Sequence, residues 1–394
     1  MRIVIAGACR SAIGKFGGAL SNVSPAELGA AVIKESIKRA DIRPENVDEV
    51  LLGCVLQAAQ GQNIARQASV RAGLPYEVPA ITVNAVCGSG LECVNEAAAK
   101  IIAGQAEVIV AAGVENMSMA PYAMTGARFG YRMNNATLID TMIRDALTDA
   151  FIDEHMMVTA ENIIKKYGIT REELDDFAAG SQKKCEIATA NGKFADEIVP
   201  ITISNKQGTF QFMNDEGPRP GTTIEALSRL KCCSGVENGL VTAGNASGIN
   251  DGAAAVLVMS EEKALELGVK PMAVWVAGAL AGVEPEIMGI GPVASTRKVL
   301  NKTGLSIDDM DLIEANEAFA GQTIAVAREL NFDMSKVNVN GGAIALGHPI
   351  GASGCRILVT LLYEMQRRGS KRGLATLCVG GGMGVSTIVE GYMS

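Results

Sequence analysis

The stretch VNAVCGSGLECVNEAAAKIIAGQAEVIVAAG, residues 83–113, decides the fold because it holds a turn, a helix and a strand in close succession. The run AITVN that leads into it has the character of a strand, and LECVNEAAAKII has the periodicity of a helix. A glycine, Gly104, then breaks the helix before a second apolar run. Strand, helix and strand in this order are typical of an α/β protein.

The same order of elements occurs twice. Residues 26–55 and 83–113 give a helix, a charged turn, a strand, a small-residue turn, a helix and a strand, and residues 295–319 and 339–382 give them again. Gly88-Ser89-Gly90 in the first copy corresponds to Ala352-Ser353-Gly354 in the second. We interpret the chain as an internal duplication of a βα-rich half.

A stretch of different composition separates the two copies. Residues 119–249 are richer in Met, Asn, Asp and Thr and contain many turn formers, as in ARFGYRMNN and NDEGPRPGTT. We predict an N-terminal half over 1–118 completed by 250–268, an inserted loop domain over 119–249 and a C-terminal half over 269–394. An insertion on a rigid scaffold either covers a substrate or is a loop domain without such a role.

Composition restricts the class of protein. The 394 residues are 48% apolar and 20% charged, which predicts a globular chain of two or three domains. A net charge of −8 argues against a nucleic-acid partner, and no apolar run is long enough to cross a membrane. The start MRIVIAGACR lacks the pattern of a signal peptide, so we expect a cytoplasmic protein. Nine cysteines without CxxC pairs and only two histidines predict reduced thiols and no metal site.

Four short stretches carry candidate chemistry. Cys87 follows a strand and precedes a helix, where the positive helix end favours a thiolate, although a buried structural cysteine fits the same turn. His348 is held between Gly347 and Pro349 at a strand end and is a candidate base. Cys378 ends a strand before three glycines, which form either an oxyanion site or a simple hairpin. Asn316 either caps a helix or orients a water.

These four residues fall at corresponding strand ends of two similar halves. Ligands gather where the carboxyl ends of strands meet in α/β sheets. Two sulfurs, an imidazole and a glycine-rich turn together indicate acyl transfer through a thioester.

The chain resembles the thiolase family, on its short-chain, biosynthetic branch, over essentially its whole length. The motifs that carry the resemblance are NAVCGSG, GVENMSMAPY, VTAGNASGINDGAA, NEAFA, GHPIGASG and CVGGGMG, in family order. The resemblance implies a five-layered αβαβα fold of two halves with an inserted loop domain. It implies an acetyl-CoA C-acetyltransferase, which condenses two acetyl-CoA to acetoacetyl-CoA and CoA reversibly, in a ping-pong reaction through an acetyl-cysteine. CoA thioesters would be substrates, no cofactor is implied, and family members commonly form homotetramers.

The resemblance also assigns roles. Cys87 would be acylated, His348 would activate it and, with Asn316, polarise the thioester oxygen through a water, and Cys378 would take a proton from the second acetyl group. The backbone N–H groups of Cys87 and Gly380 would form a second oxyanion hole. The residues implied for CoA binding are Leu147, His155, Met156, Arg219, Ala243, Ser247, Met288, Ala318 and Phe319.

Two positions depart from the family pattern. Met157 in HMMVTAEN stands where the family usually has glycine. The segment LKCCSGVENGLVTAGN is one residue longer than its counterpart, and we expect Ser234 to replace an aromatic side chain over the CoA tail. Met156, Met157 and Met288 would crowd the acyl end, which predicts a preference for four-carbon substrates.

Three other classes of protein share some of these features. A β-ketoacyl synthase would need a second histidine where Cys378 stands. A non-catalytic acyl-CoA-binding relative would be expected to lose one of the four reactive residues. A cysteine hydrolase built on Cys87, His348 and Asn316 would leave Cys378 and the insertion unexplained.

Overall fold

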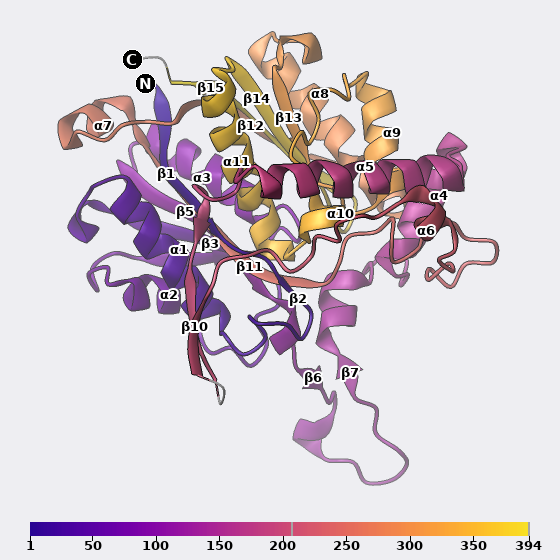
Figure 1. The fold of residues 1–394 in the computed structure, drawn as a ribbon. Coiled ribbons are helices and arrows are strands. Elements are labelled where there is room, and N and C mark those ends of the chain that lie inside the picture. Colours follow the sequence, from indigo (N-terminus) through magenta and orange to yellow (C-terminus); the bar gives the residue numbers. More distant parts are fainter. Residues whose placement is uncertain (206–207, 393–394) are drawn as a thin grey trace.

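The computed structural model describes residues 1–205 and 208–392, and nine of its strands form one continuous hydrogen-bonded path (Figure 1). The strand order along this path is β13-β14-β15-β12-β1-β11-β5-β3-β4. The strands of the first half are β1 Ile3–Ser11, β3 Glu49–Gly53, β4 Ala80–Val83, β5 Val108–Asn116 and β11 Asn250–Ser260. Those of the second are β12 Ala273–Gly282, β13 Leu312–Ala315, β14 Arg372–Val379 and β15 Met383–Gly391. The halves meet where β1 pairs antiparallel with β12.

Each half has the same strand order. From the shared boundary outward, the first half reads β1-β11-β5-β3-β4 and the second reads β12-β15-β14-β13. At the place of β4, the second half has only an isolated parallel bridge between Ile313 and Val337. The predicted duplication into two similar halves is confirmed by this repeated topology.

Helices form three layers around the strands. Helices α3 (Ser89–Ile102) and α11 (Ile350–Arg368) contact each other and lie between the two halves of the sheet, against strands of both. Helices α1 (Pro25–Arg39) and α2 (Ile64–Ala72) cover the outer face of the first half, and α8 (Gly291–Thr303) and α9 (Ala320–Leu330) cover that of the second. The predicted α-β-α-β-α fold class is therefore confirmed.

The position of each helix explains its sequence. Helix α1 begins at a capping box, in which Ser24 and Glu27 bond each other's backbone N–H, and it buries only one face. Helix α11 is buried on all sides over most of its length because it is enclosed by both halves of the sheet. Short connecting elements are α7 Glu261–Leu267, α10 Ala343–Leu346 and β2 Gly14–Lys15, with 3-10 turns at Pro44–Asn46, Met117–Met119, Ala127–Phe129, Pro285–Ile290 and Ile307–Asp309.

The inserted segment 119–249 packs on both halves. Its elements are β6 Tyr122–Ala123, β7 Ile139–Asp140, a π-helical turn Ile143–Leu147, α4 Met156–Tyr167, α5 Arg171–Ala190, β8 Ile198–Val199, β9 Ile201–Asn205, β10 Gly208–Phe212 and α6 Ile224–Ser228. Strand β8 pairs with β1, and α4 and α5 pack against α9. The β6–β7 hairpin instead extends away from the body of the molecule (Figure 1). The predicted domain limits stay predictions, and residues 393–394 of the last one lie outside the described part.

The described residues contain neither a membrane-spanning helix nor a cluster of metal ligands. Among the described residues, no helix has the length and apolar character needed to cross a membrane. In the same residues, no group of three or more His, Cys, Asp or Glu side chains is placed to hold a metal ion.

Candidate active site

The turn that carries Cys87 is strained and tightly held. Val86, a β-branched residue, has a φ of +45°, a conformation that such residues rarely adopt. The Ser89 hydroxyl donates to the Val86 carbonyl at 2.6 Å and accepts from the Ala85 N–H at 2.9 Å. The Asn84 side chain accepts from the Val86 N–H at 3.0 Å. These bonds fix Cys87 at the start of α3, as the sequence predicts.

The glycines after Cys87 serve helix packing. A Cβ at Gly88 would lie 2.7 Å from Val385, and one at Gly90 would lie 2.9 Å from the backbone N of Cys355. Both distances are too short for a real side chain, so these glycines let α3 approach β15 and α11.

Cys87 opens onto a cavity of about 340 Å³ with mostly apolar walls. The predicted site residues that line it are Cys87, Leu147, His155, Met156, Ala243, Ser247, Met288, Ala318, Phe319, His348 and Cys378. Residues from both halves and from the insertion therefore meet at one place. This arrangement agrees with an insertion that covers a substrate rather than with a loop domain remote from the site.

His348 is held with one ring nitrogen occupied and the other available. It lies between α10 and α11 and is buried. Its Nδ1 is 2.5 Å from the Ser353 hydroxyl, which itself donates to the Pro349 carbonyl at 2.9 Å. Because the hydroxyl proton is used on Pro349, the Ser353 oxygen accepts from Nδ1–H, which leaves Nε2 as an acceptor. Nε2 has no hydrogen-bond partner among the described residues.

Burial sets the charge of the imidazole. Removal from water and, to a smaller extent, the positive charge of Arg356 together lower the pKa of His348 to about 3. The ring is therefore neutral at physiological pH, which is the form that a general base requires. The backbone N–H of His348 donates to Asn250 at 2.9 Å, which fixes the loop.

Asn316 and Cys378 lie at the ends of β13 and β14. Helix α9 begins only at Ala320 with Phe319 as its N-cap, so the interpretation of Asn316 as a helix cap is wrong. The Asn316 amide is buried, and neither its oxygen nor its nitrogen has a partner within the described chain. Unpaired buried amide atoms are rare away from functional sites. Asn316 itself is not among the residues that line the cavity.

Both reactive sulfurs are protonated at rest. Burial raises the pKa of the Cys87 thiol to about 12, although N–H groups of Gly380 and of Cys87 itself lower it. Burial also raises the pKa of Cys378, and a negative charge on Cys87 raises it further. The helix N-terminus was expected to favour a thiolate at Cys87, and in this structure desolvation is the stronger effect.

Gly380 lies beside the Cys87 sulfur. Its N–H bonds to that sulfur, and a Cβ at this position would lie 3.2 Å from Val86 and 3.8 Å from Met156. Gly380 is not among the residues that line the cavity.

Comparison with known proteins identifies the family. The model of the thiolase N-terminal domain matches residues 3–262, and that of the thiolase C-terminal domain matches residues 269–391. The protein belongs to the thiolase family. It is 59% identical, over 98% of both chains, to an acetyl-CoA acetyltransferase of Syntrophomonas wolfei, and 58% identical, over 98% of both, to one of Pseudomonas aeruginosa.

Solved thiolase structures have the same fold. The Bacillus anthracis acetyl-CoA acetyltransferase superposes with a TM-score of 0.97 at 47% identity, covering 99% of both chains. A human mitochondrial 3-ketoacyl-CoA thiolase, solved in complex with CoA, gives a TM-score of 0.95 at 41% identity, covering 99% of this chain and 98% of that one.

Arg219 is the predicted site residue that lies farthest from the expected arrangement. It lines a neighbouring cavity of about 400 Å³ and not the one that contains Cys87. The two cavities share Ala243, Ala246, Gly248 and Ile249 as a common wall. Arg219 is therefore next to the thiolase pocket but separated from it by this segment.

The longer loop places Cys233, and not Ser234, at the pocket. Ser234 is buried, and its hydroxyl donates to Glu161 at 2.8 Å. Cys233 lines the cavity, and its sulfur lies 3.6 Å from that of Met157. Our assignment of Ser234 to the position over the CoA tail is wrong, because Ser234 is buried against Glu161 and Cys233 faces the cavity instead. The two departures from the family pattern are in direct contact.

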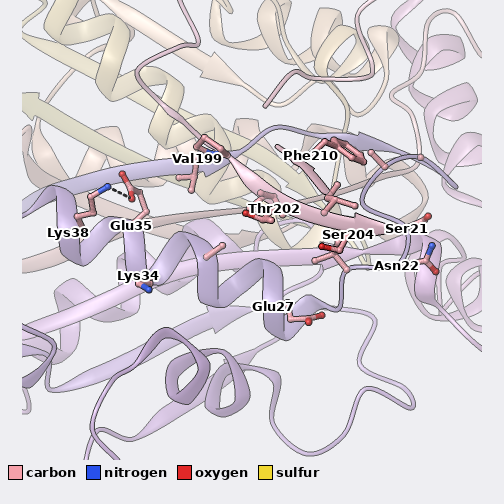
Figure 2. A pocket seen from close by; sticks show the side chains of 17 residues that line it. Ser21, Asn22, Glu27, Lys34, Glu35, Lys38, Val199, Thr202, Ser204 and Phe210 are labelled. Atoms are coloured by element: carbon pink, nitrogen blue, oxygen red, sulfur yellow. Dashed lines mark hydrogen bonds and ion pairs between the residues drawn. The ribbon is translucent and has the colours of Figure 1, made fainter. Parts of the chain in front are cut away.

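A larger cavity of the thiolase lies elsewhere (Figure 2). It has a volume of about 890 Å³ and lies between α1 and the β9–β10 hairpin, lined in part by Glu35, Lys38 and Thr202. The Lys38 ammonium is paired with Glu35 at 3.1 Å. None of the predicted site residues lines it, and its mixed lining has no group arranged for acyl transfer.

The sequence did not identify several residues of the site. Met117, Ile143 and Ile350 line the cavity, and Ser353 and Asn250 hold His348. Ser353 had a signal, because it lies one helical turn after His348 in GHPIGASG. Nothing comparable marks Met117 or Ile143, whose apolar side chains resemble those of an ordinary core.

Proposed function

We propose that this thiolase condenses two acetyl-CoA molecules to acetoacetyl-CoA and CoA, and catalyses the reverse cleavage. The observation that carries the proposal is the meeting of two thiols and an unprotonated imidazole nitrogen at one apolar cavity. The printed names of the full-length relatives support acetyl transfer as the reaction.

In the first half-reaction, Cys87 attacks the thioester carbonyl of acetyl-CoA. Its proton moves to Nε2 of His348 as the sulfur attacks, because a thiol with a pKa of about 12 does not ionise unaided. CoA leaves as a thiolate and takes that proton from His348. The N–H groups of Cys87 and Gly380 stabilise the negative oxygen of the tetrahedral intermediate.

In the second half-reaction, the Cys378 thiol first gives its proton to Nε2 of His348, and the resulting thiolate removes a proton from the methyl group of a second acetyl-CoA. Because Cys87 is now capped as a thioester, no thiolate forms beside Cys378 to raise its pKa. His348 and, through a water, Asn316 stabilise the enolate oxygen. The enolate carbon bonds to the acetyl carbonyl, the bond to Cys87 breaks, the proton taken from the methyl group passes from Cys378 to the departing sulfur, and the His348 proton returns to Cys378.

CoA binding is assigned to the walls of the cavity. Apolar contacts to the pantetheine and acyl portions come from Leu147, Met156, Ala243, Met288, Ala318 and Phe319, and polar groups come from His155 and Ser247. Arg219 in the adjoining cavity is assigned to the charged end of CoA. No resident cofactor, metal or nucleic acid takes part in this proposal.

We assign the protein to the cytoplasm as a homotetramer. The β6–β7 hairpin supports self-association, since Phe129 is 88% exposed and Met133 is 83% exposed at its end. Strand β4 is an unpaired sheet edge with Ile81 exposed, which fits a contact between two copies. Sedimentation equilibrium tests the tetramer, and a monomer at micromolar concentration contradicts it.

The activity is tested by CoA-dependent cleavage of acetoacetyl-CoA, with the Cys87→Ala protein as control. We expect acetyl-CoA as product from the unaltered protein and none from the variant. A peptide substrate assayed in parallel tests the hydrolase alternative. Tight binding of acetoacetyl-CoA without cleavage would instead identify a non-catalytic acyl-CoA-binding relative.

A further inference from the structure

The duplicated sheet places Glu115 at the strand end that corresponds to the one bearing Cys378, one residue further along. The N–H of Val108 in β5 donates to Asp48, and the N–H of Arg372 in β14 donates to Asp311 in the same way. Val108 and Arg372 are therefore equivalent, and six residues further along Val114 is the counterpart of Cys378, with Glu115 directly after it. A buried carboxyl therefore stands at the strand end where the active half has its proposed base.

The neighbouring residues correspond as well. Asp48 and Asp311 are equivalent, because each accepts from two N–H groups at the start of the adjacent strand. Five residues further along, Gly53 is therefore the counterpart of Asn316, and Cys54 follows Gly53.

The first turns of α3 and α11 correspond in the same way. A Cβ at Gly90 would meet the backbone N of Cys355, and one at Gly354 would meet that of Leu91. Each contact is the two-fold counterpart of the other, because Leu91 follows Gly90 and Cys355 follows Gly354. Three residues earlier, Cys87 and Gly351 are then equivalent. We call Cys87, Asn316 and Cys378 the open set, and Gly351, Cys54 and Glu115 the closed set.

Glu115 holds the residues around the closed set together through several hydrogen bonds. Its carboxylate is fully buried and accepts from the N–H groups of Val55 at 3.1 Å, Leu56 at 3.0 Å and Gly351 at 2.9 Å. The Cys54 thiol lies 3.7 Å away. A carboxylate with several N–H donors is a strong, directional anchor. It joins the end of β3 in the first half to the first turn of α11 in the second.

Both ends of this anchor lead to the catalytic pocket. The side chains of Val55 and Leu56 belong to the apolar cluster against which Val86 and Cys87 pack. On the other side, Gly351 lies two residues before Ser353, whose hydroxyl orients His348. The carboxylate thus connects the support of the nucleophile with the helix turn that orients the base.

The first turn of α11 and the end of β5 pack too closely for any side chain at position 351. A Cβ at Gly351 would lie 2.9 Å from the Glu115 carboxylate and 2.7 Å from the Val114 carbonyl. The glycine at 351 therefore permits the close approach of α11 to the end of β5.

We propose that Glu115 is a positioning residue, whose carboxylate fixes the separation of Cys87 and His348 and whose negative charge keeps the Cys87 thiol protonated in the resting enzyme. The proposal rests on the proposed function, in which Cys87 is the nucleophile and His348 its base.

The electrostatics of the pocket agree with the geometry. The negative charge of Glu115 raises the pKa of Cys87, in addition to the larger effect of burial. Burial raises the pKa of Glu115 itself to about 7, against the lowering effect of its three N–H donors. The titratable groups that face this carboxyl are the thiols of Cys54 and Cys87.

Two variants separate charge from geometry. Glu115→Gln removes the charge and keeps the size of the side chain, whereas Glu115→Asp keeps the charge and shortens its reach by one methylene. Glu364→Gln is the matched control, because it removes a buried carboxylate from the far end of α11, where Asn340 and Arg368 bind it. The readouts are kcat and KM for condensation, and the rate of Cys87 alkylation by iodoacetamide against pH.

With Glu115→Gln, we expect Cys87 to alkylate roughly threefold faster or more at pH 8, because loss of the charge lowers its pKa. With Glu115→Asp, we expect alkylation near the wild-type rate. In both variants kcat falls by tenfold or so, since His348 is no longer held in place, with KM little changed. Glu364→Gln leaves kcat and the alkylation profile near wild type.

An unshifted alkylation profile in a folded Glu115→Gln protein, or a wild-type kcat in both variants, overturns the proposal. If neither variant folds, the pH dependence of Cys87 alkylation in the wild-type enzyme tests the proposal instead. As Glu115 ionises near pH 7, its growing negative charge opposes formation of the Cys87 thiolate, so the logarithm of the alkylation rate should rise by less than one per pH unit there. A constant rise of one per pH unit overturns the proposal. Cys87→Ala tests the proposed function separately: if that variant still condenses acetyl-CoA, the assignment of the nucleophile fails, whatever the role of Glu115.

Discussion

The open set and the closed set occupy equivalent strand ends of a duplicated fold, but their chemistry is opposite. In the open set, the thiols of Cys87 and Cys378 face a cavity, and the Asn316 amide has no partner in the described chain. In the closed set, Glu115 is saturated by N–H donors and has no access to a cavity that the structure shows. Duplication thus supplied two similar frameworks, of which one keeps unpaired groups for a substrate and the other uses its polar group to fix the structure.

The largest expected effect comes from His348, because it has no reactive counterpart in the first half. His348→Asn should lower kcat for acetyl transfer by ~10²–10⁴, the usual effect of losing a general base. The fold should persist, since the side chain fills a similar space. Acetyl labelling of Cys87, which should stop, checks the loss of activity. The melting temperature, which should be little changed, checks that the fold persists. A variant with near wild-type labelling would mean that another group takes the Cys87 proton.

The same residue predicts a pH dependence of stability. The pKa of His348 is about 3 in the folded protein and near its ordinary value of 6.5 after unfolding. The unfolded chain therefore binds a proton below about pH 6.5 while the folded one does not, so this contribution to stability is lost as pH falls from 6.5 toward 3. The difference in unfolding free energy between wild type and His348→Asn should shrink over that range. A constant difference would show that His348 is not buried in the neutral form.

The size of the open cavity gives the next prediction. Met156, Met157 and Met288 line a volume of about 340 Å³ that also has to admit the pantetheine arm. We expect kcat/KM for an eight-carbon 3-oxoacyl-CoA to be at least ~10-fold below that for acetoacetyl-CoA, because added methylenes meet filled space. Equal values for the two substrates would show that the methionines move aside, as their flexible side chains permit.

A smaller effect is expected at the pocket entrance. Cys233→Phe should lower KM for CoA about fivefold, by adding ~1 kcal/mol of apolar contact. Ser234→Phe is the matched control one residue away, and it should instead reduce the free energy of unfolding by ~1–3 kcal/mol because Ser234 is buried on Glu161. The opposite result, with tighter CoA binding only in Ser234→Phe, would restore the assignment made from the sequence.

The smallest effect is expected within the closed set. Cys54 is a fully buried strand-end cysteine, one residue beyond the counterpart of Asn316. Cys54→Ala should change kcat by no more than about twofold and cost ~1 kcal/mol of stability. Kinetics with acetoacetyl-CoA and a denaturant titration measure the two quantities. A large loss of kcat with unchanged stability would place Cys54 in the catalytic machinery and remove the distinction between the sets.

The sequence predicted what local pattern determines. Cys87 follows strand β4 and Cys378 lies at the end of β14, both near glycine, and such places are recognisable without coordinates. His348, which the sequence placed at a strand end, lies instead between helices α10 and α11. The repeated order of elements likewise predicted two halves. The site residues that were assigned from the family motifs also meet at the cavity, with the exception of Arg219, Asn316 and Gly380.

Other features depend on contacts between distant segments. The place of Glu115, one residue beyond the counterpart of Cys378, follows from strand register, which matches the contacts of Asp48 with those of Asp311. One added residue in the loop decided whether Cys233 or Ser234 faces the pocket, and no periodicity marks that choice. The charge of Cys87 was misjudged because the helix end is visible in the sequence whereas the degree of burial is not.

The central claim is that the two sulfurs of the open set have different tasks, and half-reactions test it most directly. Labelled acetyl-CoA is mixed with Cys87→Ala and with Cys378→Ala, and acetyl groups on protein are counted before condensation is assayed. The account predicts no labelling and no condensation for Cys87→Ala, and full labelling without carbon–carbon bond formation for Cys378→Ala. Folded Cys378→Ala protein that cannot be acetylated, or Cys87→Ala protein that labels at Cys378, would contradict it.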